Sequence, residues 1–272
     1  MEAVVLGLLQ GLTEFLPISS SAHIRVFPAL FGWDDPGAAF TAVIQLGTEM
    51  AVLIYFRKDI WEIITTWTRS LWTPELRGHI AARMGWYVIL GSIPIGLLGL
   101  LLKHQIEGVF RDLRLVGTTL ILFALVLWFA DRTARNKLTL TKHLNVPHSV
   151  VYGFAQSLAL IPGVSRSGGT ITAGLLLDYR REEAARYSFL LAIPAVLASG
   201  LYELSEIGGA NTPDWGPTIL ATVISFAVGY AAVAWFLRYI STHSFTGFVV
   251  YRIALGFFVI LAVTLGWIPA LG

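Results

Sequence analysis

The segment LLQGLTEFLPISSSAHIR (residues 8–25) decides the fold, because it begins as an apolar helix and then breaks at a proline followed by three serines and a histidine. A helix needs about 20 apolar residues to cross a bilayer core of about 30 Å. The whole apolar stretch, residues 4–30, is interrupted near its middle by Pro17, so each half is too short to span. We therefore predict a helix–break–helix hairpin that enters and leaves on one side of a membrane, with its irregular backbone facing protein or a wet cavity.

The composition is that of an integral membrane protein. The chain has 272 residues, 56% of them hydrophobic, and a mean hydropathy of +0.70. Charged residues make up 13%, against roughly 25% in soluble domains. The net charge of +2 is too small to suggest a nucleic-acid partner. The absence of cysteine excludes disulfides, thiolate metal sites and thiol nucleophiles. The N-terminus lacks a basic region and a small-residue cleavage site, so we expect no removable signal peptide.

Six further stretches are long and apolar enough to span a bilayer. A second broken stretch, residues 149–177, is interrupted by Pro162 and Gly163 and resembles a second hairpin. We predict an all-α integral membrane protein with six transmembrane helices plus two re-entrant helix–break–helix hairpins. The predicted spans are residues 38–56, 84–102, 113–130, 184–202, 217–237 and 248–267.

The two broken stretches also resemble each other. Three spans follow each of them, so the second copy would be inserted upside down. We predict one membrane domain with an inverted-topology repeat, residues 1–131 and 148–272, joined by a basic cytoplasmic loop, residues 132–147. Such repeats place a polar site near the midplane, where the breaks meet; chance matching of small residues is the alternative. The matching positions, 146 residues apart, are Gly7, Gln10, Leu12, Ser19 and Ser21 with Gly153, Gln156, Leu158, Ser165 and Ser167.

The positive charges predict the orientation. Fourteen lysines and arginines fall on one side of the predicted spans and four on the other, while Arg166 lies in the second break. The positive-inside rule places the larger group in the cytoplasm. Both termini and the mouth of the first hairpin then face outside, and the second hairpin enters from the cytoplasm. The larger group is Arg57, Lys58, Arg69, Arg77, Arg83, Arg132, Arg135, Lys137, Lys142, Arg180, Arg181, Arg186, Arg238 and Arg252, and the smaller is Arg25, Lys103, Arg111 and Arg114.

The first break carries groups suited to catalysis. Gln10 and Glu14 are four residues apart and share one helix face. A carboxylate in an apolar segment indicates a functional site and suits a general acid, a base or a cation ligand; a glutamate bonded to its neighbours is the alternative. His23 follows Ser20 by three residues, which makes them a candidate nucleophile and base. The serines of this break could instead cap the returning helix.

The second break, PGVSRSGGT (residues 162–170), predicts an anion site. A helix N-terminus after a glycine turn presents backbone N–H groups to an anion. Arg166, the only arginine expected at this depth, adds a fork suited to phosphate; an internal salt bridge, for instance with Glu14, is the alternative. Gln45 and Glu49 in the first span either line the same cavity or make a helix–helix hydrogen bond. No histidine or carboxylate spacing indicates a tight transition-metal site.

Together these residues resemble a known family. QGLTEFLPISSSAH and PGVSRSGGTI, with IQLG between them and FLLAIP after, are similar to the bacterial undecaprenyl-pyrophosphate phosphatases associated with bacitracin resistance. The similarity runs over essentially the whole chain. It implies a bacterial inner-membrane enzyme that removes the terminal phosphate of undecaprenyl pyrophosphate, regenerates the lipid carrier for cell-wall precursors, and is stimulated by divalent cations. The sequence does not fix the oligomeric state, and a homodimer is one option.

The resemblance also implies roles for individual residues. Arg166 and the backbone donors of residues 165–170 would hold the diphosphate. Ser20 would attack the terminal phosphorus or position a water, and His23 would take the serine's proton or protonate a leaving oxygen. Glu14 would orient His23 or bind Mg²⁺ or Ca²⁺. The family motifs fall on Gln10, Glu14, Pro17, Ser19, Ser20 and His23, and on Pro162, Gly163, Ser165, Arg166, Ser167 and Gly168, with Thr170 just beyond; of these, Gln10, Ser19, Ser165, Ser167, Gly168 and Thr170 would bind substrate.

The sequence departs from the family pattern at two positions, and a second function also fits its architecture. Gln10 occupies an acidic position and cannot act as a carboxylate ligand or base. Ala22 stands where a glycine is usual, which restricts the turn. Inverted repeats with broken helices are also typical of transporters, so a transporter or flippase of a phosphorylated polyprenyl lipid is the alternative. A scaffolding membrane protein is a distant third, since it would not need two matched polar breaks.

Overall fold

Six long helices form the body of the protein, and they confirm the six predicted spans. The computed structural model describes residues 1–102, 112–205, 207–208 and 212–270. Within these residues the chain is helical, and the one β-type pairing is an isolated bridge between Leu138 and Tyr179. The six helices are long and apolar enough to cross a membrane: α3 (Gly37–Tyr55), α5 (Ile80–Leu101), α7 (Leu113–Thr133), α11 (Arg181–Ser205), α12 (Trp215–Ile240) and α13 (Thr246–Thr264).

Both broken stretches form two short helices separated by a break. The first stretch gives α1 (Glu2–Thr13) and α2 (Ser20–Phe31). The second gives α9 (Val146–Ser157), a 3₁₀ turn η3 (Leu158–Leu160) and α10 (Arg166–Leu176). The structure thus places each break where the sequence has its proline.

The two breaks end in the same way. Ser19 precedes α2 with a φ of 70°, and Ser165 precedes α10 with a φ of 72°. The Ser19 hydroxyl accepts from the Ala22 N–H at 3.4 Å, and the Ser165 hydroxyl accepts from the Gly168 N–H at 3.1 Å. These are N-caps, which provide a partner for one of the N–H groups that a helix start leaves unbonded. One serine of each break is therefore a cap.

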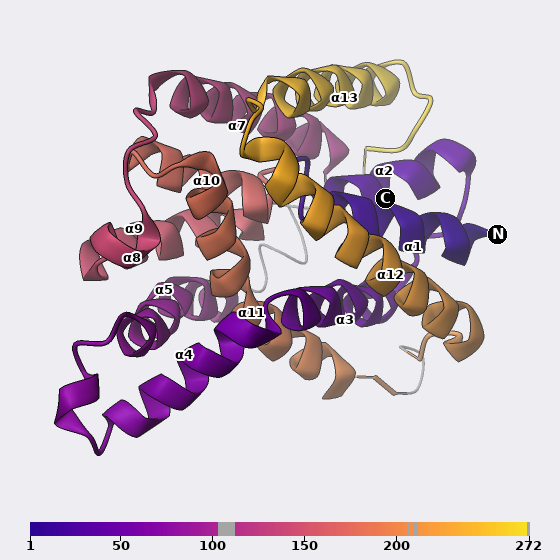
Figure 1. Ribbon diagram of the computed structural model, residues 1–272. Coiled ribbons are helices and arrows are strands. Elements are labelled where there is room, and N and C mark those ends of the chain that lie inside the picture. The colour runs from indigo at the N-terminus through magenta and orange to yellow at the C-terminus, as the bar shows by residue number, and fades with distance from the viewer. Residues whose placement is uncertain (103–111, 206, 209–211, 271–272) are drawn as a thin grey trace.

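The short helices pack against long helices from the other half of the chain. α1 lies along α12, and α9 lies along α5 (Figure 1). α12 also contacts α3, α5 contacts α11, and α7 packs against α13. The helices approach closely where they have glycine. A Cβ at Gly11 would lie 2.9 Å from the Ser225 carbonyl oxygen of α12, and one at Gly153 would lie 2.5 Å from the Gly91 carbonyl oxygen of α5.

The core between these helices is rich in aromatic side chains, among them Phe15, Tyr152, Tyr187, Phe189 and Phe236.

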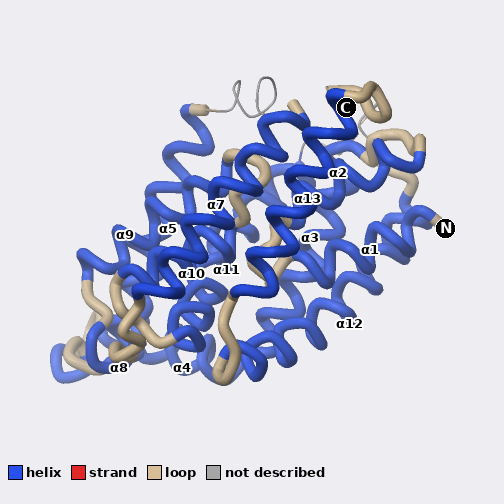
Figure 2. The backbone as a smooth tube through the Cα atoms, turned by 90° about the horizontal axis from the view of Figure 1, so that it is seen from above, coloured by secondary structure: helices blue, strands red, loops and turns tan. Residues whose placement is uncertain are grey.

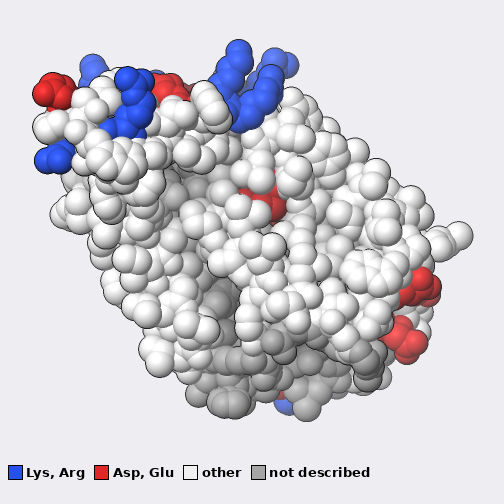
Figure 3. Space-filling view, turned by 90° about the horizontal axis from the view of Figure 1, so that it is seen from below, with Lys and Arg blue, Asp and Glu red and all other residues white. Residues whose placement is uncertain are grey.

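The outside of the helix bundle is apolar, as a lipid-facing surface requires. Large side chains are exposed along the long helices, including Leu100 on α5, Val223 on α12 and Phe257 on α13. α4 (Arg57–Ser70) and α8 (Leu140–His143) lie at one end of the bundle, and the N-terminus lies away from that end (Figure 2). Lysines and arginines gather along one edge of the face in Figure 3, and most of that face is uncharged. The chain is therefore a multi-pass membrane protein.

The structure corrects one position in the charge count. Arg252 was predicted to lie on the basic cytoplasmic side, but it is fully buried in α13 and bonds to both breaks. The physical reason is that interrupted helices leave carbonyl groups without helical partners, and a buried guanidinium can serve several of them. The expectation that Arg166 is the only arginine at this depth is wrong for the same reason. Lys103 and Arg111, which the count also used, lie outside the described residues.

Candidate active site

The two breaks meet inside the protein and are joined by side chains. The Arg252 guanidinium donates to the carbonyl oxygens of Pro17 at 3.2 Å, Gly163 at 2.9 Å and Val164 at 2.9 Å. The Ser167 hydroxyl donates to the Leu16 carbonyl at 3.0 Å. Segments about 150 positions apart in the sequence are thus fixed against each other, as the matching polar breaks predicted.

The turn at Gly163 is a position where only glycine fits. Its φ is +90°, a region that side-chain-bearing residues rarely adopt. A Cβ there would also lie 2.1 Å from the Thr119 hydroxyl of α7, which donates to the Pro162 carbonyl at 2.6 Å. The turn therefore brings the second break against α7 and directs α10 toward the first break.

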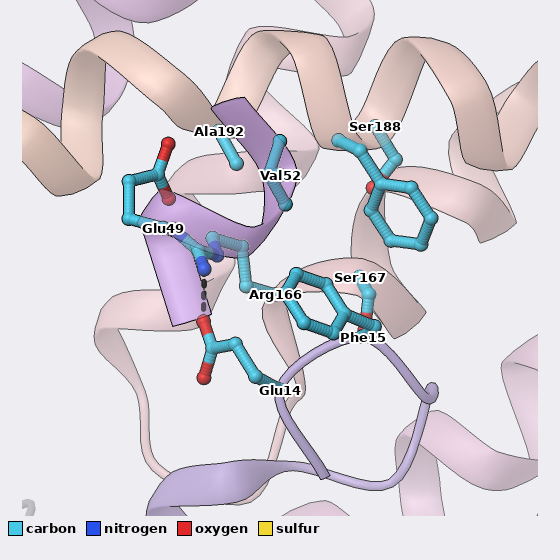
Figure 4. A pocket seen from close by; sticks show the side chains of 9 residues that line it. Glu14, Phe15, Glu49, Val52, Arg166, Ser167, Ser188 and Ala192 are labelled. Atoms are coloured by element: carbon cyan, nitrogen blue, oxygen red, sulfur yellow. Dashed lines mark hydrogen bonds and ion pairs between the residues drawn. The ribbon is translucent and has the colours of Figure 1, made fainter. Parts of the chain in front are cut away.

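Glu14 is the centre of the site. One of its carboxylate oxygens accepts from the Ser20 hydroxyl at 2.5 Å and from the Gln10 amide at 3.1 Å. The other oxygen forms an ion pair with the Arg166 guanidinium (Figure 4). The Glu14 side chain is 5% exposed and that of Arg166 is 17% exposed, so this pair lies largely out of water. The alternative of an internal salt bridge between these two residues is what the structure shows.

Ser20 is therefore bonded to the carboxylate and not to the histidine. Ser20 is the first residue of α2, and its hydroxyl points back to Glu14. The His23 ring lies 2.7 Å from the Ser19 carbonyl oxygen through Nδ1 and 2.7 Å from the Tyr251 hydroxyl through Nε2. The structure does not bring Ser20 and His23 into a hydrogen bond. It adds Tyr251, stacked on His23 at 5.6 Å between ring centroids, a residue that sequence reasoning missed.

The remaining predicted substrate-binding residues hold the second break in shape. Ser165 caps α10, and its hydroxyl lies 3.3 Å from that of Ser167. The Thr170 hydroxyl donates to the Arg166 carbonyl at 2.9 Å and contacts the Ser188 hydroxyl of α11. Gly168 lies so close to Arg252 that a Cβ would be 2.8 Å from its Nη1. Arg166 is the first residue of α10, and its guanidinium is in the ion pair with Glu14, near the N–H groups of the helix start.

A small pocket opens beside the Glu14–Arg166 pair. The carboxylate of Glu49, from α3, lies on the opposite side of the Arg166 guanidinium from Glu14 (Figure 4). Of the two alternatives for Glu49, the structure therefore favours the cavity. Apolar side chains and two serines complete the pocket, whose lining is Glu14, Phe15, Glu49, Val52, Arg166, Ser167, Ser188, Phe189 and Ala192.

The donor set of this pocket fits a hard divalent cation. Mg²⁺ and Ca²⁺ prefer oxygen ligands, and Mg²⁺ commonly takes one or two carboxylates and completes its shell with water and substrate phosphate. The pocket offers the carboxylates of Glu14 and Glu49. One oxygen of Glu49, Oε1, is buried and has no hydrogen-bond partner in the described part of the chain. Among the described residues no group of three or more His, Asp or Glu could hold a metal, so the protein alone would not complete a shell.

Comparison with known proteins gives a consistent result. The model of the family described as "Bacitracin resistance protein BacA" matches residues 3–258. An undecaprenyl-diphosphatase from Nocardioides sp. is 59% identical, with 99% of this chain and 98% of the relative covered. One from Thermobifida fusca is 60% identical, with 98% and 91% covered. Undecaprenyl-diphosphatase 2 from Streptomyces coelicolor is 58% identical, with 97% and 95% covered. The chain belongs to the bacitracin resistance protein BacA family.

Proposed function

We propose that this protein is a bacterial inner-membrane phosphatase that hydrolyses undecaprenyl diphosphate to undecaprenyl phosphate and inorganic phosphate, which recycles the lipid carrier for cell-wall synthesis. Relatives at about 59% identity over nearly the whole chain are named undecaprenyl-diphosphatases. The observation that carries the proposal is the arrangement of Ser20, Glu14 and Arg166 where the two breaks meet. A transporter would need the anion-binding arginine but no hydroxyl bonded to a buried carboxylate.

The geometry supports a phosphoryl-transfer mechanism with Ser20 as nucleophile. The Ser20 hydroxyl already donates to Glu14, so Glu14 accepts its proton as the oxygen attacks the terminal phosphorus. The bond from that phosphorus to the bridging oxygen breaks, and undecaprenyl phosphate leaves. Water then hydrolyses the phosphoserine, which releases inorganic phosphate and restores the hydroxyl. Arg166 turns from Glu14 to the phosphate oxygens and stabilises their charge.

The other site residues have supporting roles in this proposal. His23 holds the turn that carries the nucleophile, because it bonds to the Ser19 carbonyl beside Ser20. Gln10 keeps Glu14 in place through its amide. A divalent cation, Mg²⁺ or Ca²⁺, held by Glu14 would neutralise charge on the phosphate oxygens when bound. The polyprenyl chain would lie between the spans, in contact with lipid.

The proposed architecture is an inverted repeat with two re-entrant hairpins, residues 1–131 and 148–272 joined by the loop 132–147. In the described part of the chain three long helices separate the breaks, and an odd number of spans would reverse the direction of the second copy. The matched Ser19 and Ser165 caps support a common origin. So does the exchanged packing, since α1 contacts α12 as α9 contacts α5, and α12 contacts α3 as α5 contacts α11.

The function is tested by phosphate release from the purified full-length protein in detergent with Mg²⁺ or Ca²⁺ present. We expect release from undecaprenyl diphosphate but little from undecaprenyl phosphate, which has no phosphoanhydride. Ser241→Ala, an exposed serine at the end of α12, serves as a control and should release phosphate at the parent rate. A parent protein that releases none, yet binds or moves the lipid between leaflets, would favour the flippase.

The orientation is tested with single cysteines, because the chain has none of its own. Lys137 and Thr212 are both exposed and lie at opposite ends of the long helices. We expect a membrane-impermeant maleimide added to intact cells to label Thr212→Cys and not Lys137→Cys, which should label only after the membrane is opened. Labelling of Lys137→Cys alone in intact cells would reverse the proposed orientation and place the first hairpin on the cytoplasmic side.

A further inference from the structure

Glu49 is a buried carboxylate that the proposed mechanism leaves without a role. It lies in the middle of α3, a membrane-spanning helix, and is only 3% exposed. Its Oε1 atom has no hydrogen-bond partner among the residues that the structure describes. A carboxylate in such a place is costly and is tolerated where a partner or a function requires it. Because Glu49 lines the pocket beside Glu14 and Arg166, its partner is expected to bind in that pocket.

The charges of the pocket point to a cation as that partner. Among the described residues that line it, two carry carboxylates, Glu14 and Glu49, and one carries a guanidinium, Arg166. Arg166 is ion-paired with Glu14. Arg252 directs its two Nη groups to backbone carbonyls of the breaks, while its Nε is buried without a hydrogen-bond partner in the described residues. A diphosphate bound by Arg166 beside this small pocket would bring further negative charge. A bound divalent cation would balance this excess and share its shell with the phosphate oxygens.

Gln10 stands at a position that is acidic in the family pattern, so the first short helix offers the pocket one carboxylate, at its C-cap Glu14. Its amide donates to Glu14 and lies 3.5 Å from the Thr48 hydroxyl, next to Glu49 in the chain. Because residue 10 is an amide, α1 cannot offer a second carboxylate to a cation in the pocket. The neighbouring helix α3 supplies it instead, one residue beyond the Thr48 contact.

We propose that Glu49 is a ligand, with Glu14, of a divalent cation at the pocket where the phosphate groups bind. The inference rests on the proposed function, because the phosphate oxygens and water complete the shell that two carboxylates leave open. Figure 4 shows the two carboxylates on either side of Arg166. In the proposed mechanism Arg166 moves from Glu14 to the substrate, and this movement would free the position between the two carboxylates for the cation.

The test measures cation binding directly, without relying on activity. Mn²⁺ is titrated into purified full-length protein in detergent, and the loss of its free paramagnetic resonance signal gives the dissociation constant. We expect the parent to bind one Mn²⁺ and Glu49→Gln to bind it at least about tenfold more weakly, since loss of even an outer-shell partner costs about 10–100-fold. Glu49→Asp, which keeps a carboxylate, should bind more tightly than Glu49→Gln.

Controls make the result specific to the pocket. Glu62→Gln removes an exposed carboxylate of α4 and should bind Mn²⁺ as the parent does. Gel filtration and the midpoint of unfolding in denaturing detergent show whether each variant is folded. If Glu49→Gln does not fold, Glu49→Asp still tests the role of this carboxylate. Parent-like Mn²⁺ binding by folded Glu49→Gln, or a parent that binds no Mn²⁺, would overturn the inference. If the same parent preparation still releases phosphate, the proposed function stands; if it releases none, the function fails whatever the Mn²⁺ result.

Discussion

Glu14→Gln is expected to lower kcat for phosphate release by at least about 1000-fold, the scale on which loss of a nucleophile or its base acts in hydrolases. The substitution keeps the size of the side chain but removes the group that accepts the Ser20 proton at 2.5 Å. It also removes the partner of Arg166, so the guanidinium would lie in the pocket without its counter-charge. Initial rates at saturating lipid, measured by phosphate release, check the prediction.

The hydrogen bond between Ser20 and Glu14 allows a further prediction, for a variant in which both residues are replaced. Residues that act as one unit are strongly non-additive. We therefore expect Glu14→Gln to slow the Ser20→Ala variant by a much smaller factor than it slows the parent, with any further loss due to the contacts of Glu14 with Arg166 and the cation. Glu2→Gln, an exposed carboxylate in the first turn of α1, should keep the parent rate. Losses that multiply in the double variant would show that Glu14 acts separately from Ser20.

Arg252→Met is expected to destabilise the protein by about 3 kcal/mol or more, because each buried carbonyl left without a partner costs about 1–3 kcal/mol. The guanidinium bonds to three carbonyls across both breaks. Removing the buried charge also removes its desolvation cost, and this gain offsets part of the lost stability. The three carbonyls remain unpaired. Unfolding in mixed micelles with increasing denaturing detergent measures the change in the free energy of unfolding.

The same substitution should also slow catalysis, since the two breaks carry different parts of the site. Ser20 follows the first break and Arg166 follows the second, so loosening one against the other separates them. Arg69→Met, an exposed arginine of α4, controls for loss of a positive charge and should leave stability and rate unchanged. A stability of Arg252→Met equal to that of the parent would mean that the breaks are held together by other contacts.

Hydropathy and proline positions predict the helices of this chain well. The length of each apolar run decides whether it can cross a bilayer, and the prolines of the two broken stretches interrupt helical hydrogen bonding. The six spans and four short helices follow from these local effects. The pairing of the breaks was also predictable, because the serine motifs at Ser19 and Ser165 recur in the sequence.

The sequence was less informative about what a buried polar side chain contacts. Arg252 near the start of a span looks like a cytoplasmic anchor until the breaks supply its carbonyl partners. The spacing of Ser20 and His23 predicted a pair, but the positive φ of Ser19 and the packing of α13 direct the histidine to Tyr251 instead. Such contacts depend on how helices rotate against one another, and periodicity within one helix does not contain that information.

The ion pair between Glu14 and Arg166 makes the enzyme's own carboxylate a competitor of every anion that enters. The ion pair is made through one nitrogen of the guanidinium, Nη2. In the proposed mechanism a ligand must displace Glu14 from that nitrogen, and this cost is the same for substrate and product. A lipid diphosphate offsets this free-energy cost with the contacts that its second phosphate and its hydrocarbon chain make. Free phosphate has neither, so in the proposed mechanism the return of Glu14 to the guanidinium favours its release. The internal competitor thus favours turnover over retention of the product.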